Sequence, residues 1–239
     1  MSKKSTRKTS HKSKPVEDAI DEQFHEEVKP QRDLSPLEAR TEAQSHYVMA
    51  INSGQLIFGL GPAGTGKTYI ASVLASDALI DKRVKKLIIT RPAIEAGESL
   101  GFLPGTLNEK FDPYFWPVRE VLNRRMGASF VDYMIRRKQI EVMPLAYMRG
   151  VTFRESFVIF DEAQNATPSQ MKMFLTRIGE HSKVVVNGDC RQSDIGVMNG
   201  LTDAVGRLTK VKGVKTVEFS NQDIVRSGLT ARIVQAYES

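Results

Sequence analysis

One loop restricts the fold of this chain more than any other feature of its sequence. Residues 61–68 fit the phosphate-binding pattern G-x-x-x-x-G-K-[ST]. Small residues let successive backbone N–H groups point inward around the α- and β-phosphates, and a helix that starts at the loop adds its unpaired N–H groups. Lys67 is expected to reach the β- and γ-phosphates, and the hydroxyl of Thr68 to bind Mg²⁺. The predicted triphosphate-binding residues are therefore Gly61, Pro62, Ala63, Gly64, Thr65, Gly66, Lys67 and Thr68.

Apolar strands and amphipathic helices alternate on both sides of this loop. Strands are predicted over residues 55–58, 86–90, 140–143, 157–162, 183–189 and 214–219. Helices are predicted over residues 36–52, 67–79, 117–125, 130–138, 168–178 and 224–237. The first of them has Ser35 as N-cap and Pro36 at its first position. Such alternation implies right-handed crossovers and a mainly parallel sheet covered on both faces. The expected fold is a three-layer α/β domain.

The strand that ends in Asp161-Glu162 supplies the carboxylates that a phosphate-loop enzyme needs. Four apolar residues precede the pair, so the acidic groups emerge only at the carboxyl end of a buried strand. Asp161 is expected to hold Mg²⁺. Because strand side chains alternate between faces, Glu162 is expected to point elsewhere and to orient or deprotonate the attacking water. This pair favours hydrolysis over phosphoryl transfer to a small molecule.

A polar turn, Gly188-Asp189-Cys190-Arg191-Gln192, follows the next predicted strand. A polar side chain at this place can contact the γ-phosphate, and Gln192 is the candidate. Cys190 is expected to be a small packed residue rather than a nucleophile, because the sequence shows no base to activate it.

Composition indicates a protein without disulfides or membrane spans. The chain has one cysteine, and no apolar run approaches the length of a membrane span. We therefore expect a cytoplasmic protein. Residues 1–14 hold six Lys or Arg and residues 15–28 hold six Asp or Glu. Residues 1–33 are predicted to form a disordered charged tail, with a nucleic-acid-binding basic arm as the alternative, and residues 34–239 to form the domain.

Residues 93–138 interrupt the alternating pattern and are predicted to be an insertion rich in aromatic and basic residues. The aromatic residues are Phe102, Phe111, Tyr114, Phe115 and Trp116. They could pack in a core, stack on bases or contact another subunit. The basic residues are Arg119, Arg124, Arg125, Arg136, Arg137 and Lys138. They could form a solvated face or a groove for a nucleic-acid backbone.

Taken together, these motifs resemble the PhoH-like ATPases, whose core is similar to one RecA-type domain of a superfamily 1 helicase. The matching segments are the phosphate loop, T-R-P-A-I-E-A-G-E-S-L-G-F-L-P-G (90–105), P-L-A-Y-M-R-G (144–150), F-V-I-F-D-E-A-Q-N (157–165), M-K-M-F-L-T-R-I-G (171–179), G-D-C-R-Q-S-D (188–194) and D-I-V-R (223–226). The resemblance implies an ATPase that uses ATP and Mg²⁺ and is coupled to RNA or single-stranded DNA, as a helicase or translocase. A slow nucleotide-switched assembly or regulatory protein is the alternative.

The same resemblance implies roles for two residues outside the loop. Gln44 is a possible adenine contact, and Arg226 resembles the arginine that meets the γ-phosphate. Since the chain has one phosphate loop and room for one RecA-type domain, we expect a neighbouring subunit to lend this arginine within a homo-oligomeric ring, most simply a hexamer. Arg177 and Arg149 are the alternatives to Arg226 as the arginine lent to the neighbouring subunit. The alternative assembly is a monomer in which Arg226 acts within its own subunit.

Overall fold

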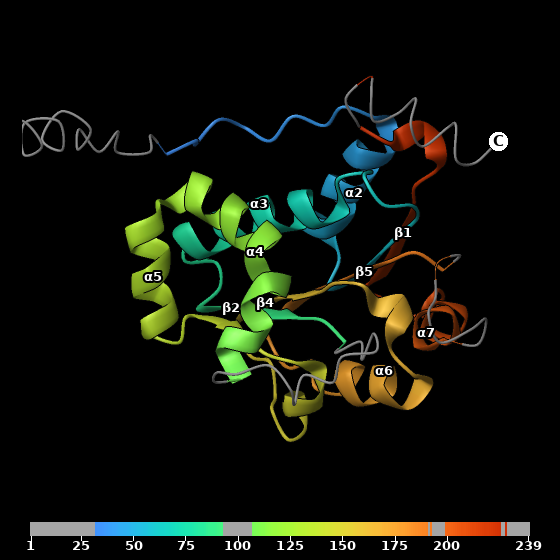
Figure 1. Cartoon of the computed structure of the whole chain (residues 1–239). Helices are drawn as coiled ribbons and strands as arrows, with labels where there is room; N and C mark the ends of the chain where they lie inside the picture. The colour runs from blue at the N-terminus through green and yellow to red at the C-terminus, as the bar shows by residue number, and fades with distance from the viewer. Residues whose placement is uncertain (1–31, 93–106, 191, 193–198, 226–227, 229–239) are drawn as a thin grey trace, which may run out of the picture. The chain divides into compact units, whose positions relative to one another are not determined.

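The computed structural model describes residues 32–92, 107–190, 192, 199–225 and 228, which belong to one compact unit (Figure 1). The predicted tail up to residue 31 and most of the predicted closing helix (224–237), from residue 229 onward, lie outside the described residues. The predicted start of that helix is wrong, because Ile224 is extended and Val225 is not helical. None of the helices in the described part of the chain is both long enough and apolar enough to cross a membrane.

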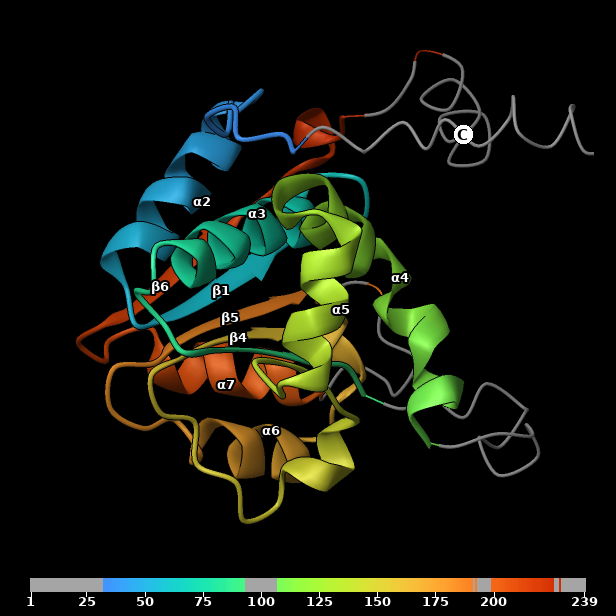
Figure 2. The same ribbon diagram turned by 90° about the vertical axis from the view of Figure 1, so that its left-hand side faces the viewer.

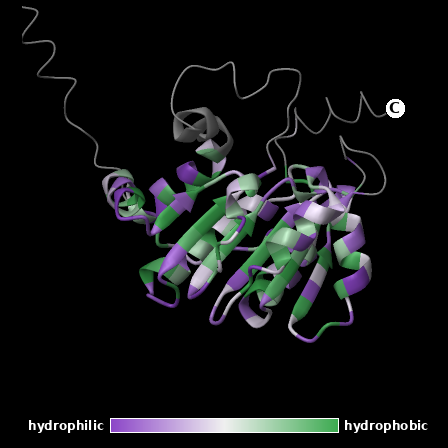
Figure 3. Cartoon of the chain, turned by 90° about the horizontal axis from the view of Figure 1, so that it is seen from below, coloured by the Kyte–Doolittle hydropathy of each residue, from purple (hydrophilic) through white to green (hydrophobic). Residues whose placement is uncertain are grey.

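A six-stranded parallel sheet with the order β3-β2-β4-β5-β1-β6 forms the middle of this unit. The strands are β1 (Leu56–Leu60), β2 (Lys86–Thr90), β3 (Ile140–Val142), β4 (Ser156–Phe160), β5 (Lys183–Gly188) and β6 (Val214–Glu218). Every residue of β1 and of β4 is buried, because helices cover both faces of a parallel sheet. Figure 3 shows the strands as mainly hydrophobic. The predicted α/β fold with a mainly parallel sheet is confirmed.

Helices cover the two faces of the sheet with two separate hydrophobic cores (Figure 2). The first core lies under α2 (Glu42–Ser53), α3 (Lys67–Ile80), α4 (Leu107–Met126) and α5 (Ala128–Arg136). The second core lies under α6 (Pro168–Leu175) and α7 (Gly200–Leu208). Three short 3-10 helices complete the described elements: η1 (Leu145–Met148), η2 (Ala163–Asn165) and η3 (Asn221–Asp223).

Helix α2 begins later than the sequence predicted. Its N-cap is Thr41, whose side-chain oxygen accepts a hydrogen bond from the backbone N–H of Gln44 at 3.2 Å. The predicted N-cap, Ser35, instead donates its hydroxyl to the carboxylate of Asp33 at 2.5 Å. The predicted start at Ser35-Pro36 is therefore wrong, and residues 34–39 form no helix.

A buried arginine explains why this segment stays out of the helix. The guanidinium of Arg125, on α4, donates to the backbone carbonyls of Asp33 and Ser35 at 2.8 and 2.6 Å. It also pairs with the carboxylate of Asp77, on α3, at 2.6 Å. The Ser35 carbonyl is the one that the first hydrogen bond of the predicted helix would use, so a tertiary interaction overrides the local capping signal.

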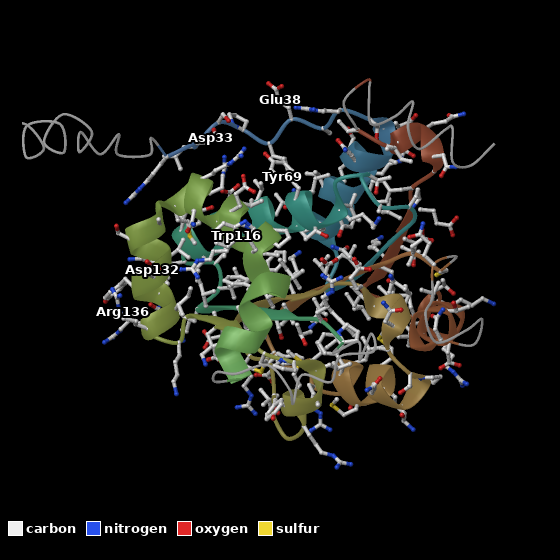
Figure 4. All side chains as sticks on the ribbon, viewed as in Figure 1. Asp33, Glu38, Tyr69, Trp116, Asp132 and Arg136 are labelled. Carbon is white, nitrogen blue, oxygen red and sulfur yellow. The ribbon has the colours of Figure 1, made fainter. Side chains whose placement is uncertain are left out.

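Helix α4 continues through Pro113 and Pro117, whereas the sequence predicted a helix only from residue 117. Phe115 is buried in the first core, and the neighbouring Trp116 is 65% exposed (Figure 4). Four buried positions, Phe115, Val118, Leu122 and Met126, recur at helical spacing along the inner face. The described part of the predicted insertion thus contributes side chains to the first core.

Besides the buried Arg125, two basic residues of α4 form ion pairs. Arg119 pairs with Asp132 at 2.8 Å, and Arg124 pairs with Glu120 at 2.5 Å. Three others, Arg136, Arg137 and Lys138, are exposed at the end of α5. The predicted groove for a nucleic-acid backbone therefore stays a prediction that depends on this exposed group.

Candidate nucleotide-binding site

The phosphate loop connects the end of β1 to the start of α3 and needs glycine for steric reasons. Gly61 has φ 134° and Gly66 has φ 85°, in a region that residues with a side chain rarely adopt. A Cβ atom at Gly61 would lie 2.3 Å from the backbone oxygen of Phe219. The loop is thus held in shape by its own glycines and by the chain that follows β6.

Lys67 lies at the mouth of this loop and carries its fixed positive charge. Its Nζ donates to the backbone carbonyls of Gly61 and Pro62 at 2.6 and 2.8 Å and to Oγ1 of Thr65 at 3.1 Å. Burial lowers the pKa of Lys67, and the nearby carboxylates, Asp161 foremost, act in the opposite direction. The ammonium is therefore placed among polar groups where a phosphate would gain a charged donor.

Thr68 and Asp161 form the pair expected of a metal site. The Thr68 hydroxyl donates to both carboxylate oxygens of Asp161, at 3.0 and 3.1 Å. Burial raises the pKa of Asp161 and the neighbouring Glu162 raises it further, while the Thr68 hydrogen bond lowers it. A hydroxyl beside a half-buried carboxylate is an oxygen donor set that suits Mg²⁺, which takes its other ligands from phosphates and water. Within the described ranges, no cluster of three His, Cys, Asp or Glu offers a different metal site.

Glu162 lies in the same cavity, but not for the reason that the sequence suggested. Strand β4 ends at Phe160, so the alternation of strand side chains does not reach residue 162. Glu162 adopts a left-handed conformation with φ 51° and ψ 39°. This turn, rather than the strand, sets the direction of its carboxylate.

Two side chains contact the carboxylate of Glu162. Its Oε1 lies 3.3 Å from Nη2 of Arg91, at the carboxyl end of β2. Its Oε2 accepts a hydrogen bond from Nε2 of Gln164 at 2.6 Å. Gln164 is buried, and its Oε1 accepts the backbone N–H of Asp189 at 3.2 Å. The contacts join the carboxyl ends of β2, β4 and β5.

The strand order places the polar turn after β5 directly beside the phosphate loop. Strand β5 lies between β1 and β4, and the N–H of Gly61 donates to the carbonyl of Gly188 at 3.1 Å. A cavity of about 280 Å³ results, and Gln192 is one of the residues that line it. Its other lining side chains include Lys67, Thr68, Asp161, Glu162, Gln164 and Asp189. The predicted γ-phosphate contact of Gln192 stays a prediction, now with a suitable position.

A second cavity, of about 570 Å³, adjoins the first at Gly64, Gly66 and Tyr69, which line both. The segment before α2 forms one of its walls, and Figure 4 shows Tyr69 on α3 below this segment. Gln44 also lines it, with Nε2 donating to the carbonyl of Thr65 at 3.0 Å and Oε1 accepting from the N–H of Arg40 at 2.8 Å. Gln44 thus supports the phosphate loop, and its predicted adenine contact remains a prediction.

The chain after β6 returns to the phosphate loop. The N–H of Val225 donates to the carbonyl of Gly64 at 3.0 Å, and Val225 lines the larger cavity. Arg226, the next residue, lies outside the described residues. The two alternative arginines for the γ-phosphate lie within the described residues. Arg149 is exposed after η1, and Nε of Arg177 donates to the carbonyl of Met173 at 3.3 Å.

A family model described as "PhoH-like protein" matches residues 36–238. The chain belongs to this family. It is 54% identical to "Protein PhoH" of Escherichia coli (strain K12) over 210 residues, which is 86% of this chain and 59% of that protein. It is 48% identical to "PhoH-like protein" of Bacillus subtilis (strain 168) over 217 residues, which is 90% of this chain and 68% of that protein. The matched part of the chain thus spans about three fifths of the length of Protein PhoH.

Two solved structures resemble this PhoH-like chain more distantly. The UvsW helicase from Bacteriophage T4 gives a TM-score of 0.45 at 13% identity, over 87% of this chain and 69% of that one. Pif1 helicase from Candida albicans gives a TM-score of 0.43 at 14% identity, over 84% and 44%. At these scores the likeness decides neither the fold nor the function. The family together with the phosphate-loop fold supports a nucleotide hydrolase, and such proteins in general use a nucleotide and a divalent metal.

Two residues of this PhoH-like chain were missed as site residues by sequence reasoning. Arg91 directly follows a predicted strand, and Gln164 lies within the quoted segment 157–165. Both positions carried a usable signal, because the carboxyl ends of parallel strands meet at one edge of the sheet. Arg91 and Gln164 could be assigned to Glu162 only once the order of the strands in the sheet was known. The sequence pattern does not predict that order.

Proposed function

We propose that this PhoH-like chain binds ATP with Mg²⁺ and hydrolyses the bond between the β- and γ-phosphates. The observation that carries the proposal is one cavity that combines the phosphate loop, the half-buried Thr68–Asp161 pair and the carboxylate of Glu162. A phosphate-loop enzyme needs these three parts: a cradle, a metal ligand set and a group that acts on water.

Each group has a defined task in this proposal. Lys67 binds the β- and γ-phosphates. Thr68 and Asp161 would hold the Mg²⁺, which would supply positive charge against the phosphates. Glu162 takes a proton from a water molecule while the oxygen of that water bonds to the γ-phosphorus. The bond to the bridging oxygen breaks, and ADP and inorganic phosphate leave. Gln192 contacts the γ-phosphate at the mouth of the cavity.

The binding step is tested by replacing Lys67 with Ala. The change removes the ammonium at the phosphates, so we expect ATP affinity to fall by about ten- to a hundredfold. Isothermal titration or a fluorescent ATP analogue measures this. Lys85→Ala is a matched control, because Lys85 is exposed and pairs with Glu155 at 2.7 Å. Equal ATP affinity in the wild type and Lys67→Ala would refute the site.

We further propose that hydrolysis is coupled to RNA or single-stranded DNA. The support comes from the exposed basic residues at the end of α5 and the exposed Trp116, since single strands bind through phosphate contacts and base stacking. The alternative is a slow nucleotide switch that controls assembly. It is favoured by the ion pair that already engages Glu162.

ATP turnover with and without single strands separates these two functions. We expect poly-uridine RNA or an oligo-thymidine strand to stimulate turnover several-fold at low salt, and the stimulation to fall steeply as salt rises. Steady-state phosphate release at several salt concentrations measures it. A rate that neither strand changes would favour the slow switch.

A further inference from the structure

The carboxylate proposed as the base is engaged by protein groups through both of its oxygens. Oε1 of Glu162 faces the guanidinium of Arg91, and Oε2 accepts from the Gln164 amide. A general base must present an oxygen to the water from which it takes a proton. In this arrangement one donor faces each oxygen of Glu162 and competes with water for its acceptor sites.

The two contacts differ in how readily they break. Gln164 is 4% exposed, and its Oε1 accepts a hydrogen bond from the backbone N–H of Asp189. Its side chain, and with it the contact to Glu162, is therefore fixed at the edge of the sheet. The side chains of Arg91 and Glu162 are 25% and 39% exposed. Ion pairs that solvent reaches contribute little to stability and are weakened further by salt. The Arg91 contact is therefore the one that a ligand can remove.

We propose that Arg91 is a latch on Glu162, and that a phosphate of a single-stranded nucleic acid opens the latch by binding the Arg91 guanidinium. The proposal rests on the proposed hydrolysis by Glu162 and adds its regulation. With the pair closed, turnover is low; with Arg91 drawn to a phosphate, Oε1 of Glu162 is released to accept the proton of water. A guanidinium suits this exchange, because its fork of donors matches phosphate as well as carboxylate.

The surroundings of Arg91 favour a single strand as the source of that phosphate. The backbone carbonyl of Arg91 accepts the N–H of Leu145, so 3-10 helix η1 begins next to the latch. This short helix carries Tyr147, which is 59% exposed, and Arg149 follows it on the surface. An exposed ring and a cation beside a phosphate-binding arginine are the groups that bind stacked bases and their backbone.

A different role for Arg91, in catalysis, predicts the opposite effect of its loss on ATP turnover. If the guanidinium turned towards the γ-phosphate during hydrolysis, it would stabilise the transition state, and its loss would slow the reaction under every condition. A latch, in contrast, slows the reaction only while it is closed.

The test compares kcat and KM for ATP, with and without oligo-thymidine at low salt, in the wild type and in Arg91→Gln. We expect Arg91→Gln to raise the unstimulated kcat several-fold, to approach the stimulated wild-type rate, and to gain little from added DNA. Its KM for ATP should stay within about twofold, because Lys67 and the loop are unchanged. Arg91→Lys keeps the charge but loses the forked guanidinium. Its unstimulated kcat should lie between those of the wild type and Arg91→Gln.

Two controls connect the result to the latch. Arg154→Gln removes the same charge from an exposed residue just before the opposite end of β4 and should behave as wild type. The double variant Arg91→Gln/Glu162→Gln should be as inactive as Glu162→Gln alone, because the released group is absent. Thermal unfolding of each variant checks that the fold is retained.

The outcomes distinguish failure of the proposed latch from failure of the proposed ATP hydrolysis. A folded Arg91→Gln with lower kcat in both conditions, or with wild-type rates in both, overturns the latch while hydrolysis stands. No ATP turnover in the wild type, in Arg91→Gln or in Arg91→Lys overturns the proposed hydrolase function itself.

Discussion

Replacing Glu162 with Gln should stop ATP turnover while ATP stays bound. The amide fills nearly the same space, and the loop, Lys67 and the Thr68–Asp161 pair are unchanged. It cannot accept the proton that the attacking water must lose. General base catalysis contributes about 10²–10⁴-fold, so the rate should fall by that factor with the ATP affinity within a few-fold of wild type.

Single-turnover phosphate release and equilibrium ATP binding, measured on the same preparation, test this expectation. Glu155→Gln is a matched control, because it makes the same chemical change just before β4, at the end opposite the site, in an exposed pair with Lys85. Such surface pairs contribute about 0–1 kcal/mol, so this control should fold and turn over as wild type. If Glu162→Gln keeps more than about a tenth of the wild-type rate, the base lies elsewhere.

The order of the elements could be predicted from the sequence because its signals are local. β2 was predicted with the bounds that the structure shows, since a mainly apolar run rich in β-branched residues follows Lys86. Helix α6 begins as predicted at Thr167-Pro168, where a capping box with Gln170 forms within one turn. The phosphate loop could be predicted for the same reason, because its pattern is contained in eight consecutive residues.

What the sequence did not provide depends on contacts between distant residues. Ser35-Pro36 has the form of a helix start, but Arg125, ninety residues away in the chain, holds the carbonyls of this segment. The sequence predicted a helix only from Pro117, but α4 also runs through Pro113, because the burial of Phe115 and its helical neighbours stabilises it. The partners of Glu162 depend on strand order and on one left-handed residue, and neither leaves a local pattern.

The final prediction concerns Arg226 and the assembly of the chain. We propose that subunits form a ring, most simply a hexamer, in which Arg226 of one subunit stabilises the charge that develops at the nucleotide of the next. An arginine finger contributes about 10³–10⁵-fold in rate, so Arg226→Ala should lose nearly all turnover yet still bind ATP. The hydrogen bond from Val225 to Gly64 of the same chain supports the other arrangement, in which Arg226 serves its own subunit.

Mixing two inactive variants, Glu162→Gln and Arg226→Ala, decides between these arrangements. In a randomly mixed ring, about a quarter of the interfaces would combine an intact Glu162 with an intact Arg226 from the neighbour, so part of the activity should return. Arg207→Ala, which removes an exposed arginine paired with Asp203 on α7, is the control and should stay active. If mixing restores nothing and the wild type sediments as a monomer with ATP and Mg²⁺, the ring is refuted and Arg226 acts within its own subunit.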